Sequence, residues 1–189
     1  MQEVGAGLRA QIRLEETEDD AQFKARQQQM QQEGQELAKI LSAESCQHMG
    51  NEAFKNKDFD KAIKSYTKAL RKLGAAPRAE ESARATQVAC LTNRAACRLK
   101  VSPPDVDGCA DDCCAALEID ATNVKALFRR GTAFGLMGGM DAAAIGDMEA
   151  ALVLKPDDKG IRSSLDRLKR RVAKESVATA TPVREPDPE

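Results

Sequence analysis

A lysine and an arginine four residues apart form the pair of side chains in this sequence best suited to bind an anion. Lys125 and Arg129 lie in the segment NVKALFRR. Side chains at this spacing share one face of a helix, so both can reach one anionic group. Arginine offers a planar fork for two parallel hydrogen bonds, and lysine supplies a mobile point charge. The pair favours carboxylate binding, although such a pair on an exposed helix is most often only a solvated surface.

Cysteines are the other candidates for chemistry, because three of the six lie close together. Cys109, Cys113 and Cys114 could bind a metal, and some pairs could form disulfides. However, the sequence has no two CxxC pairs, and its only histidine, His48, lies far from them. Free cysteine packs as a small hydrophobic residue. We therefore predict structural thiols, no metal, no cofactor, and a reducing, cytoplasmic environment.

Composition excludes several other classes of function. The net charge of -1 gives no sign of a nucleic-acid partner. No apolar run approaches the roughly 18 residues of a membrane span, which argues against membrane insertion. The sequence shows no nucleophile–base pair. It also shows no glycine-rich phosphate loop, since Gly138-Gly139 is interpreted as a turn between helices. The sequence therefore predicts a protein that is not an enzyme.

The N-terminal part is expected to hold a long helix ahead of the main domain. Residues 1–19 are acidic and aperiodic, and we predict disorder there. Residues 20–42 are predicted to form a lead-in helix, because Phe23, Met30 and Leu37 recur at seven-residue spacing. A coiled coil is an alternative, but the next position in the series is a glutamate. We expect this helix to pack on the first repeat, and it or the tails could contact a client or second protein.

Three repeats are predicted from the spacing of small residues over residues 43–174. Ala62 and Ala144 are each followed seven residues later by Ala-Leu, and Cys109 takes the same place between them. A motif that recurs at intervals of roughly 20 to 50 residues indicates stacked helix pairs and an all-α fold. The predicted units are repeats at 43–76, 84–121 and 122–156, a capping helix at 158–174, and a disordered tail at 175–189.

The chain resembles the tetratricopeptide repeat family. The matching positions are Gly50, Ala62, Tyr66, Ala69 and Leu70 in the first repeat, Ala95, Cys109, Ala116 and Leu117 in the second, and Gly131, Phe134, Ala144, Ala151 and Pro156 in the third. The resemblance covers about residues 43–156 and the capping helix. It implies a right-handed superhelix of antiparallel helix pairs with a concave groove.

Within that family, the strings LTNRAACRLK and NVKALFRR resemble co-chaperones that hold the C-terminus of heat-shock chaperones of the 70 and 90 kDa classes. The resemblance implies a carboxylate clamp of five residues. By position, its members here are Asn51, Asn93, Lys125 and Arg129, and the fifth position holds Gln47 where a lysine is usual. Asparagine amides can donate hydrogen bonds to carboxylate oxygens without adding charge.

Gln47 is the departure from this pattern. A hydrogen bond to a charged donor contributes about 1.5–3 kcal/mol, against about 0.5–1.5 kcal/mol for a neutral one. Glutamine should therefore weaken the clamp by about 1 kcal/mol without abolishing it. The competing hypothesis is a repeat scaffold for an unrelated peptide or helix, which the missing lysine favours.

Overall fold

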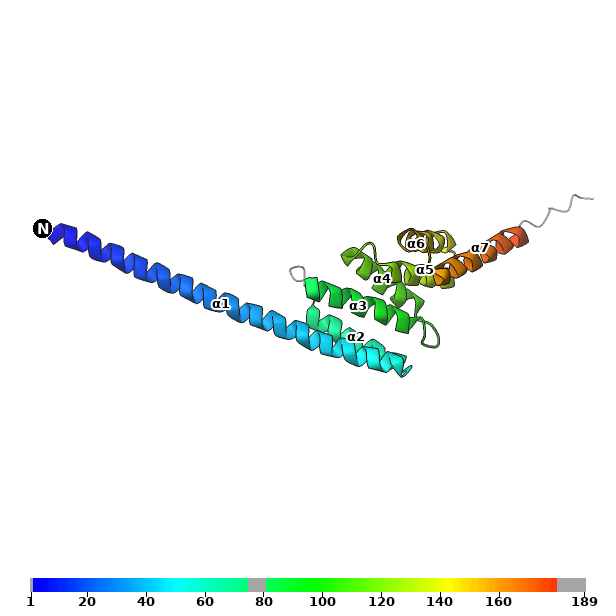
Figure 1. The fold of residues 1–189 in the computed structure, drawn as a ribbon, viewed down its shortest axis with the longest axis horizontal. Coiled ribbons are helices and arrows are strands. Elements are labelled where there is room, and N and C mark those ends of the chain that lie inside the picture. Colours follow the sequence, from blue (N-terminus) through cyan, green and yellow to red (C-terminus); the bar gives the residue numbers. More distant parts are fainter. Residues whose placement is uncertain (1, 75–80, 180–189) are drawn as a thin grey trace, which may run out of the picture. The chain divides into compact units, whose positions relative to one another are not determined.

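The protein consists of helices joined by short connections. We describe it from a computed structural model over residues 2–74 and 81–179, which contain seven helices and no strand (Figure 1). The chain divides into two compact units, Met1–Ser42 and Ala43–Glu189. The helices are α1 (Gln2–Lys55), α2 (Phe59–Leu73), α3 (Glu81–Arg98), α4 (Val106–Ile119), α5 (Val124–Met137), α6 (Asp141–Leu154) and α7 (Lys159–Thr179).

Helix α1 differs from the prediction for the N-terminal part. It is one continuous helix from Gln2 to Lys55, where the sequence predicted disorder over residues 1–19 and a separate lead-in helix over residues 20–42. The segment contains no proline and is rich in Gln, Glu and Ala, which favour a helix without any apolar periodicity. Gly34 does not interrupt it, because a single glycine costs only about 1 kcal/mol in a helix.

The seven-residue series in the first unit does not form a buried face. Phe23, Met30 and Leu37 expose 62%, 65% and 51% of their surface. Within the first unit these side chains are therefore not covered by packing, and their contact with the first repeat stays a prediction. The spacing reflects one apolar stripe on a solvent-exposed helix.

The second unit is a row of packed helices. Residues 43–55 of α1 pack with α2 through a core around Ala43, Ala53 and Tyr66. From α2 onward, each helix packs against the next one in the chain, and α3 also contacts α5 (Figure 1). Helix α7 packs on α6 and continues to Thr179, so residues 175–179 are helical rather than disordered. The rest of the predicted tail, 180–189, lies outside the described residues.

Four helices of this unit start with the same kind of side-chain cap, and in α7 the carboxylate of Asp158 accepts a hydrogen bond from the backbone N–H of Ile161. The carboxylate of Asp58 accepts a hydrogen bond from the backbone N–H of Lys61 at 3.1 Å. Asp105 and Asn123 do the same at the starts of α4 and α5. Each cap satisfies one of the N–H groups that lack a partner in the first helical turn. The polar turns between the helices therefore also define where the helices start.

The small residues that recur at seven-residue spacing lie in the core. All six small residues of the pattern are fully buried: Ala62, Ala69, Cys109, Ala116, Ala144 and Ala151. Small side chains let paired helices approach closely, which explains why alanine and cysteine occupy these places. Gly50 serves the same purpose, because a Cβ atom there would lie 2.6 Å from Cε1 of Tyr66. This close approach places the following residue, Asn51, beside the hydroxyl group of Tyr66.

Candidate functional site

Asn51 and Asn93 are in direct contact, although they lie 42 residues apart in the sequence. The side-chain oxygen of Asn51 accepts a hydrogen bond from the hydroxyl group of Tyr66 at 2.8 Å. It also accepts one from the amide nitrogen of Asn93 at 3.3 Å. Because this oxygen is occupied, the amide group of Asn51 presents its N–H donors for any further partner. Two of the predicted clamp residues are thus joined and oriented as donors.

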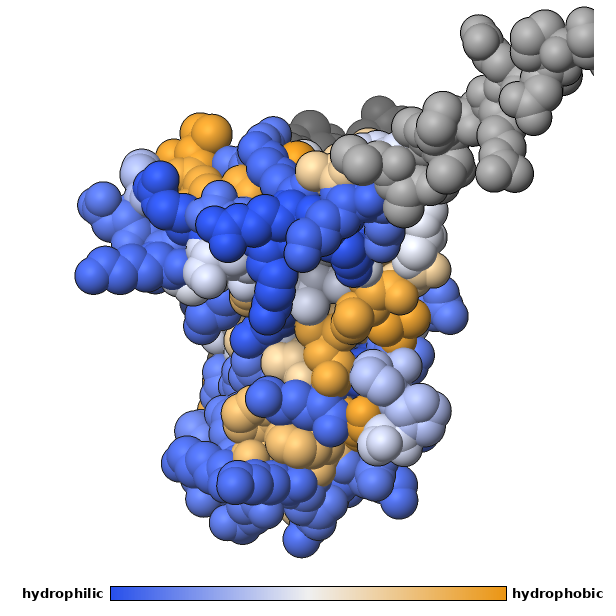
Figure 2. Space-filling model, turned by 90° about the vertical axis from the view of Figure 1, so that its right-hand side faces the viewer, coloured by the Kyte–Doolittle hydropathy of each residue, from blue (hydrophilic) through white to orange (hydrophobic). Residues whose placement is uncertain are grey.

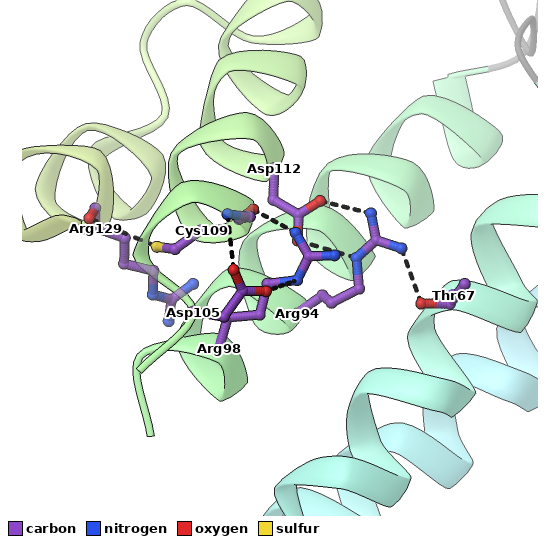
Figure 3. A network of polar contacts seen from close by, with 8 residues as sticks. Thr67, Arg94, Arg98, Asp105, Cys109, Asp112 and Arg129 are labelled. Atoms are coloured by element: carbon purple, nitrogen blue, oxygen red, sulfur yellow. Dashed lines mark hydrogen bonds and ion pairs between the residues drawn. The ribbon is translucent and has the colours of Figure 1, made fainter. Parts of the chain in front are cut away.

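Arg129 of α5 reaches across to α3 next to these asparagines. Its guanidinium group donates a hydrogen bond to the backbone carbonyl oxygen of Thr92 at 2.6 Å. Its own carbonyl oxygen lies 3.8 Å from the sulfur of Cys109 (Figure 3). Burial lowers the pKa of Arg129 from its ordinary, very high value. The group still carries its charge at neutral pH, since an arginine pKa starts above 12.

Lys125 lies one helical turn before Arg129 and is exposed to solvent. It lines a hollow together with Val88, Ala89 and Thr92 of α3. Within residues 2–74 and 81–179, its ammonium group has no hydrogen-bond or ion-pair partner. Lys125 is therefore available to bind an anionic ligand, whereas Arg129 is partly committed to the fold.

Gln47 is the predicted site residue that the structure does not connect to the others. It is partly exposed on α1, one turn before Asn51. Its side chain makes no hydrogen bond to the rest of the chain as described here. The structure thus links Asn51, Asn93 and Arg129 through α3, places Lys125 beside Thr92, and leaves Gln47 with a free amide.

Tyr66 is a site residue that the sequence reasoning assigned only to packing. Its ring is 1% exposed, and its hydroxyl group holds the oxygen of Asn51. Burial raises the pKa of Tyr66 to about 12, while the hydrogen bond with Asn93 and the charge of Arg129 act in the opposite direction. Tyr66 therefore remains a neutral donor at physiological pH. A buried tyrosine normally requires a hydrogen-bond partner for its hydroxyl group. That requirement could have indicated from the sequence that Tyr66 contacts a polar side chain.

A buried ion-pair network fixes α3 against α4 directly beside the site. Arg94 follows Asn93 in the chain and forms two hydrogen bonds with the carboxylate of Asp112, at 2.9 and 2.5 Å. It also donates to the hydroxyl oxygen of Thr67 at 2.9 Å. A second arginine, Arg98, lies 3.4 Å from the same carboxylate, which therefore sits between two guanidinium groups (Figure 3).

The third repeat contains the same arrangement. Arg130 follows Arg129 and forms two hydrogen bonds with Asp147 of α6, at 2.8 and 2.7 Å. In both repeats, the residue after a predicted clamp position holds a buried carboxylate of the next helix. This ion pair fixes the rotation of the first helix of the repeat. The predicted clamp residue that precedes the arginine therefore points away from the ion pair. The sequence reasoning missed both pairs, because the partners are 17 or 18 residues apart.

A groove continues from Arg129 along the second unit. It has a volume of about 670 Å³ and is lined by parts of α1, α3, α5, α6 and α7 and by the turn that follows α3. Phe54, Leu99, Phe128 and Leu136 supply apolar surface. Basic groups come from Lys100, Arg129, Arg167 and Arg171. The lining therefore suits a peptide that has both apolar and acidic side chains.

All six cysteines are free thiols, and all but Cys114 are buried. Burial raises the pKa of Cys90 to about 12 and that of Cys97 to about 11. A hydrogen bond between Cys109 and Cys113, together with burial, raises the pKa of Cys113 far above its usual range. Among the described residues there is no group of three His, Cys, Asp or Glu side chains placed to hold a metal ion.

We expect one thiol to react with iodoacetamide much faster than the other five at pH 8. Thiolate is the reactive form, and a thiol with a pKa near 11 or 12 is almost wholly protonated at that pH. Cys114, which is only partly buried, should account for the fast phase. Mass spectrometry of timed samples measures this, and Cys114→Ser should remove the fast phase. Rapid labelling of several thiols in the folded protein would contradict the structural role.

Comparison with known proteins gives the family. No family model matches the chain. The tetratricopeptide repeat domain of Arabidopsis OM64 is 32% identical, with a TM-score of 0.60, and the match covers 70% of this chain and 98% of that domain. This chain belongs to the tetratricopeptide repeat family. The predicted all-α superhelical fold is thereby confirmed.

Two further solved structures of this family are similar over most of the repeat domain. One is the Caenorhabditis elegans myosin chaperone UNC-45 in complex with an Hsp90 peptide. It is 37% identical with a TM-score of 0.57, and the match covers 69% of this chain and 14% of that one. The other is the second repeat domain of human RPAP3 in complex with the HSP70 peptide SGPTIEEVD. It is 28% identical with a TM-score of 0.56, and the match covers 71% of this chain and 98% of that one.

The curated relatives are much longer than the segment they share with this tetratricopeptide repeat protein. Outer envelope protein 61 of Arabidopsis thaliana is 31% identical over 142 residues, and the match covers 75% of this chain and 25% of the relative. The chain therefore spans about a quarter of that protein. Across the helices described here, none is long and apolar enough to cross a membrane.

Proposed function

We propose that this chain is an adaptor that binds the acidic C-terminal peptide of heat-shock chaperones of the 70 and 90 kDa classes in its concave groove. The observation that carries the proposal is the hydrogen bond between Asn51 and Asn93, with Arg129 fixed beside it. This contact joins two predicted clamp residues from separate repeats, which supports a shared site. Similar domains in UNC-45 and RPAP3 are solved with Hsp90 and HSP70 peptides, which supports the same use here.

The chemistry of such a peptide matches the donors. A peptide that ends in aspartate presents two carboxylates close together, on the terminus and on the side chain. Asn51 and Asn93 offer neutral amide donors, and Lys125 supplies an unpaired positive charge. Arg129 retains N–H donors beyond the one that it gives to Thr92, since a guanidinium group has five. Charged hydrogen bonds of this kind are the stronger ones.

Titration with an acetylated peptide ending in Met-Glu-Glu-Val-Asp tests the proposal. We expect micromolar affinity by isothermal titration calorimetry, and a large loss when the C-terminus of the peptide is amidated. Affinity should also fall as salt is added, because charge pairs at the surface of a groove are screened. No saturation at hundreds of micromolar peptide would overturn the chaperone assignment.

Replacing Gln47 with lysine should tighten peptide binding by about five- to tenfold. The free side chain of Gln47 lies one turn from Asn51, so a lysine there could add a charged hydrogen bond worth about 1 kcal/mol more than the neutral one. Titration of Gln47→Lys against the wild type measures the gain. Glu44→Gln also raises the charge of α1 by one and serves as the control. Equal gains in both variants would mean that only net charge matters.

A second candidate function is a scaffold for a different peptide, which the glutamine at position 47 favours. In either case we infer a protein without catalytic activity that acts in the cytoplasm. We also propose that residues 20–42 provide a contact for a client or second protein. Their exposed apolar side chains, Phe23, Met30 and Leu37, support that assignment.

A further inference from the structure

Helix α7 carries an excess of positive charge on its exposed side. Seven basic and two acidic side chains lie between Lys159 and Thr179. Lys159, Arg167, Arg170 and Lys174 share one stripe with Ser163, at positions i, i+8, i+11, i+15 and i+4. Together with Arg162 and Arg171 they line one hollowed surface, and among the described residues of this lining Asp166 is the only acid. Figure 2 shows hydrophilic residues over much of the upper part of this face of the molecule.

Some basic groups of α7 serve the fold, and others do not. Arg171 donates to the carbonyl oxygen of Gly135 and pairs with Asp141, and Lys169 pairs with Glu149. These contacts fix α7 on α5 and α6.

Besides Lys159 in the first turn, three exposed cations of α7 remain without such a role. Arg167, Arg170 and Lys174 make no hydrogen bond or ion pair with the chain as far as the structure describes it. Neighbouring like charges repel each other and gain nothing for the stability of the helix. This stripe, Arg167, Arg170 and Lys174, is called the basic stripe below.

The basic stripe is continuous with the groove that starts at Arg129. Arg167 and Arg171 line both the hollow on α7 and the groove that holds Phe54, Leu99 and Arg129. A peptide whose carboxylates are held at Asn93 and Arg129 can follow this groove toward α7. Its upstream residues then reach a surface of uncompensated positive charge.

We propose that the basic stripe of α7 binds acidic side chains located upstream of the docked C-terminal segment of the same peptide. This inference rests on the proposed function, because it assumes that the end of the peptide lies at the Asn51–Asn93 site. The continuity with the groove favours an extended acidic peptide over a flat anionic surface. The basic stripe thereby selects among partners that share one C-terminal sequence.

Two peptides with the same C-terminal end test the selection. One has Glu-Gly-Glu-Gly-Glu before Met-Glu-Glu-Val-Asp, and the other has Ser-Gly-Ser-Gly-Ser in that place. We expect the wild type to bind the acidic peptide roughly three- to tenfold more tightly, since exposed ion pairs contribute modestly. The triple variant Arg167→Gln/Arg170→Gln/Lys174→Gln should bind both peptides equally, with the affinity that the wild type has for the neutral one.

A matched variant controls for net charge. Lys61→Gln/Lys64→Gln/Lys68→Gln removes three exposed charges from α2 and should keep the preference for the acidic peptide. Equal wild-type affinity for the two peptides, with binding intact, overturns the inference and leaves the proposed function standing. Saturation by neither peptide overturns both. Binding to vesicles with anionic lipid that the triple variant abolishes, without any preference between peptides, would assign the stripe to a membrane surface instead.

Discussion

Replacing Asp112 with alanine should lower the free energy of unfolding by about 3 to 5 kcal/mol. The carboxylate is 3% exposed and lies between the guanidinium groups of Arg94 and Arg98. Without it, the partly buried charge of Arg94 has no counter-charge and keeps only Thr67 as a partner, while Arg98 keeps the carboxylate of Asp105. The cost arises from this uncompensated charge rather than from the value of the ion pair itself.

Urea denaturation followed by circular dichroism measures the effect of Asp112→Ala. Asp111→Ala is the matched control, because Asp111 precedes it on the same helix and is exposed. The control should change the free energy of unfolding by less than about 0.5 kcal/mol. If the two variants lost similar stability, the ion-pair network would not be what holds α3 on α4. Peptide affinity should fall in parallel, since Asn93 precedes Arg94.

Replacing Lys125 with alanine should weaken binding of the Met-Glu-Glu-Val-Asp peptide by about 10- to 100-fold. A charged hydrogen bond contributes about 1.5–3 kcal/mol, and Lys125 has no other described partner to lose. The variant should therefore unfold at the same urea concentration as the wild type. Arg129→Ala is a less clean test, because it also removes the hydrogen bond to the carbonyl oxygen of Thr92.

Calorimetric titration of Lys125→Ala measures the loss. Lys64→Ala on α2 removes an equal charge from an exposed position and should leave the affinity unchanged. The amidated peptide tests whether Lys125 pairs with the C-terminal carboxylate of the peptide. If it does, amidation should reduce the affinity of Lys125→Ala less than it reduces the affinity of the wild type. Unchanged affinity in Lys125→Ala would exclude this lysine from the site.

Helix order and repeat register could be predicted from local sequence alone. Helix α4 lies inside the predicted second repeat, 84–121, and the aspartate cap at Asp105 marks its start. The buried places of Ala62, Cys109 and Ala144 also agree with the spacing of small residues. Predictions failed in α1, because apolar periodicity was used as the criterion for order. A long polar helix needs only helix-forming residues and the absence of proline.

The site could be predicted only in part. Family resemblance placed Asn51, Asn93, Lys125 and Arg129, but it gave no reason to include Tyr66 or to expect the ion pairs of Arg94 and Arg130. Those contacts join helices from different parts of the chain, and no local pattern marks them.

The sequence by itself determines that Lys125 and Arg129 share one face, because the geometry of a helix sets the position of neighbours four residues apart. Tertiary packing determines which partners the side chains on that face contact. The contact between Asn51 and Asn93 spans 42 residues and exists only because Gly50 lets α1 approach Tyr66. Likewise, Lys125 remains free while Arg129 is held by Thr92, a difference that two adjacent turns of one helix do not encode. The reason is that such contacts depend on which side chains neighbouring helices bring into reach.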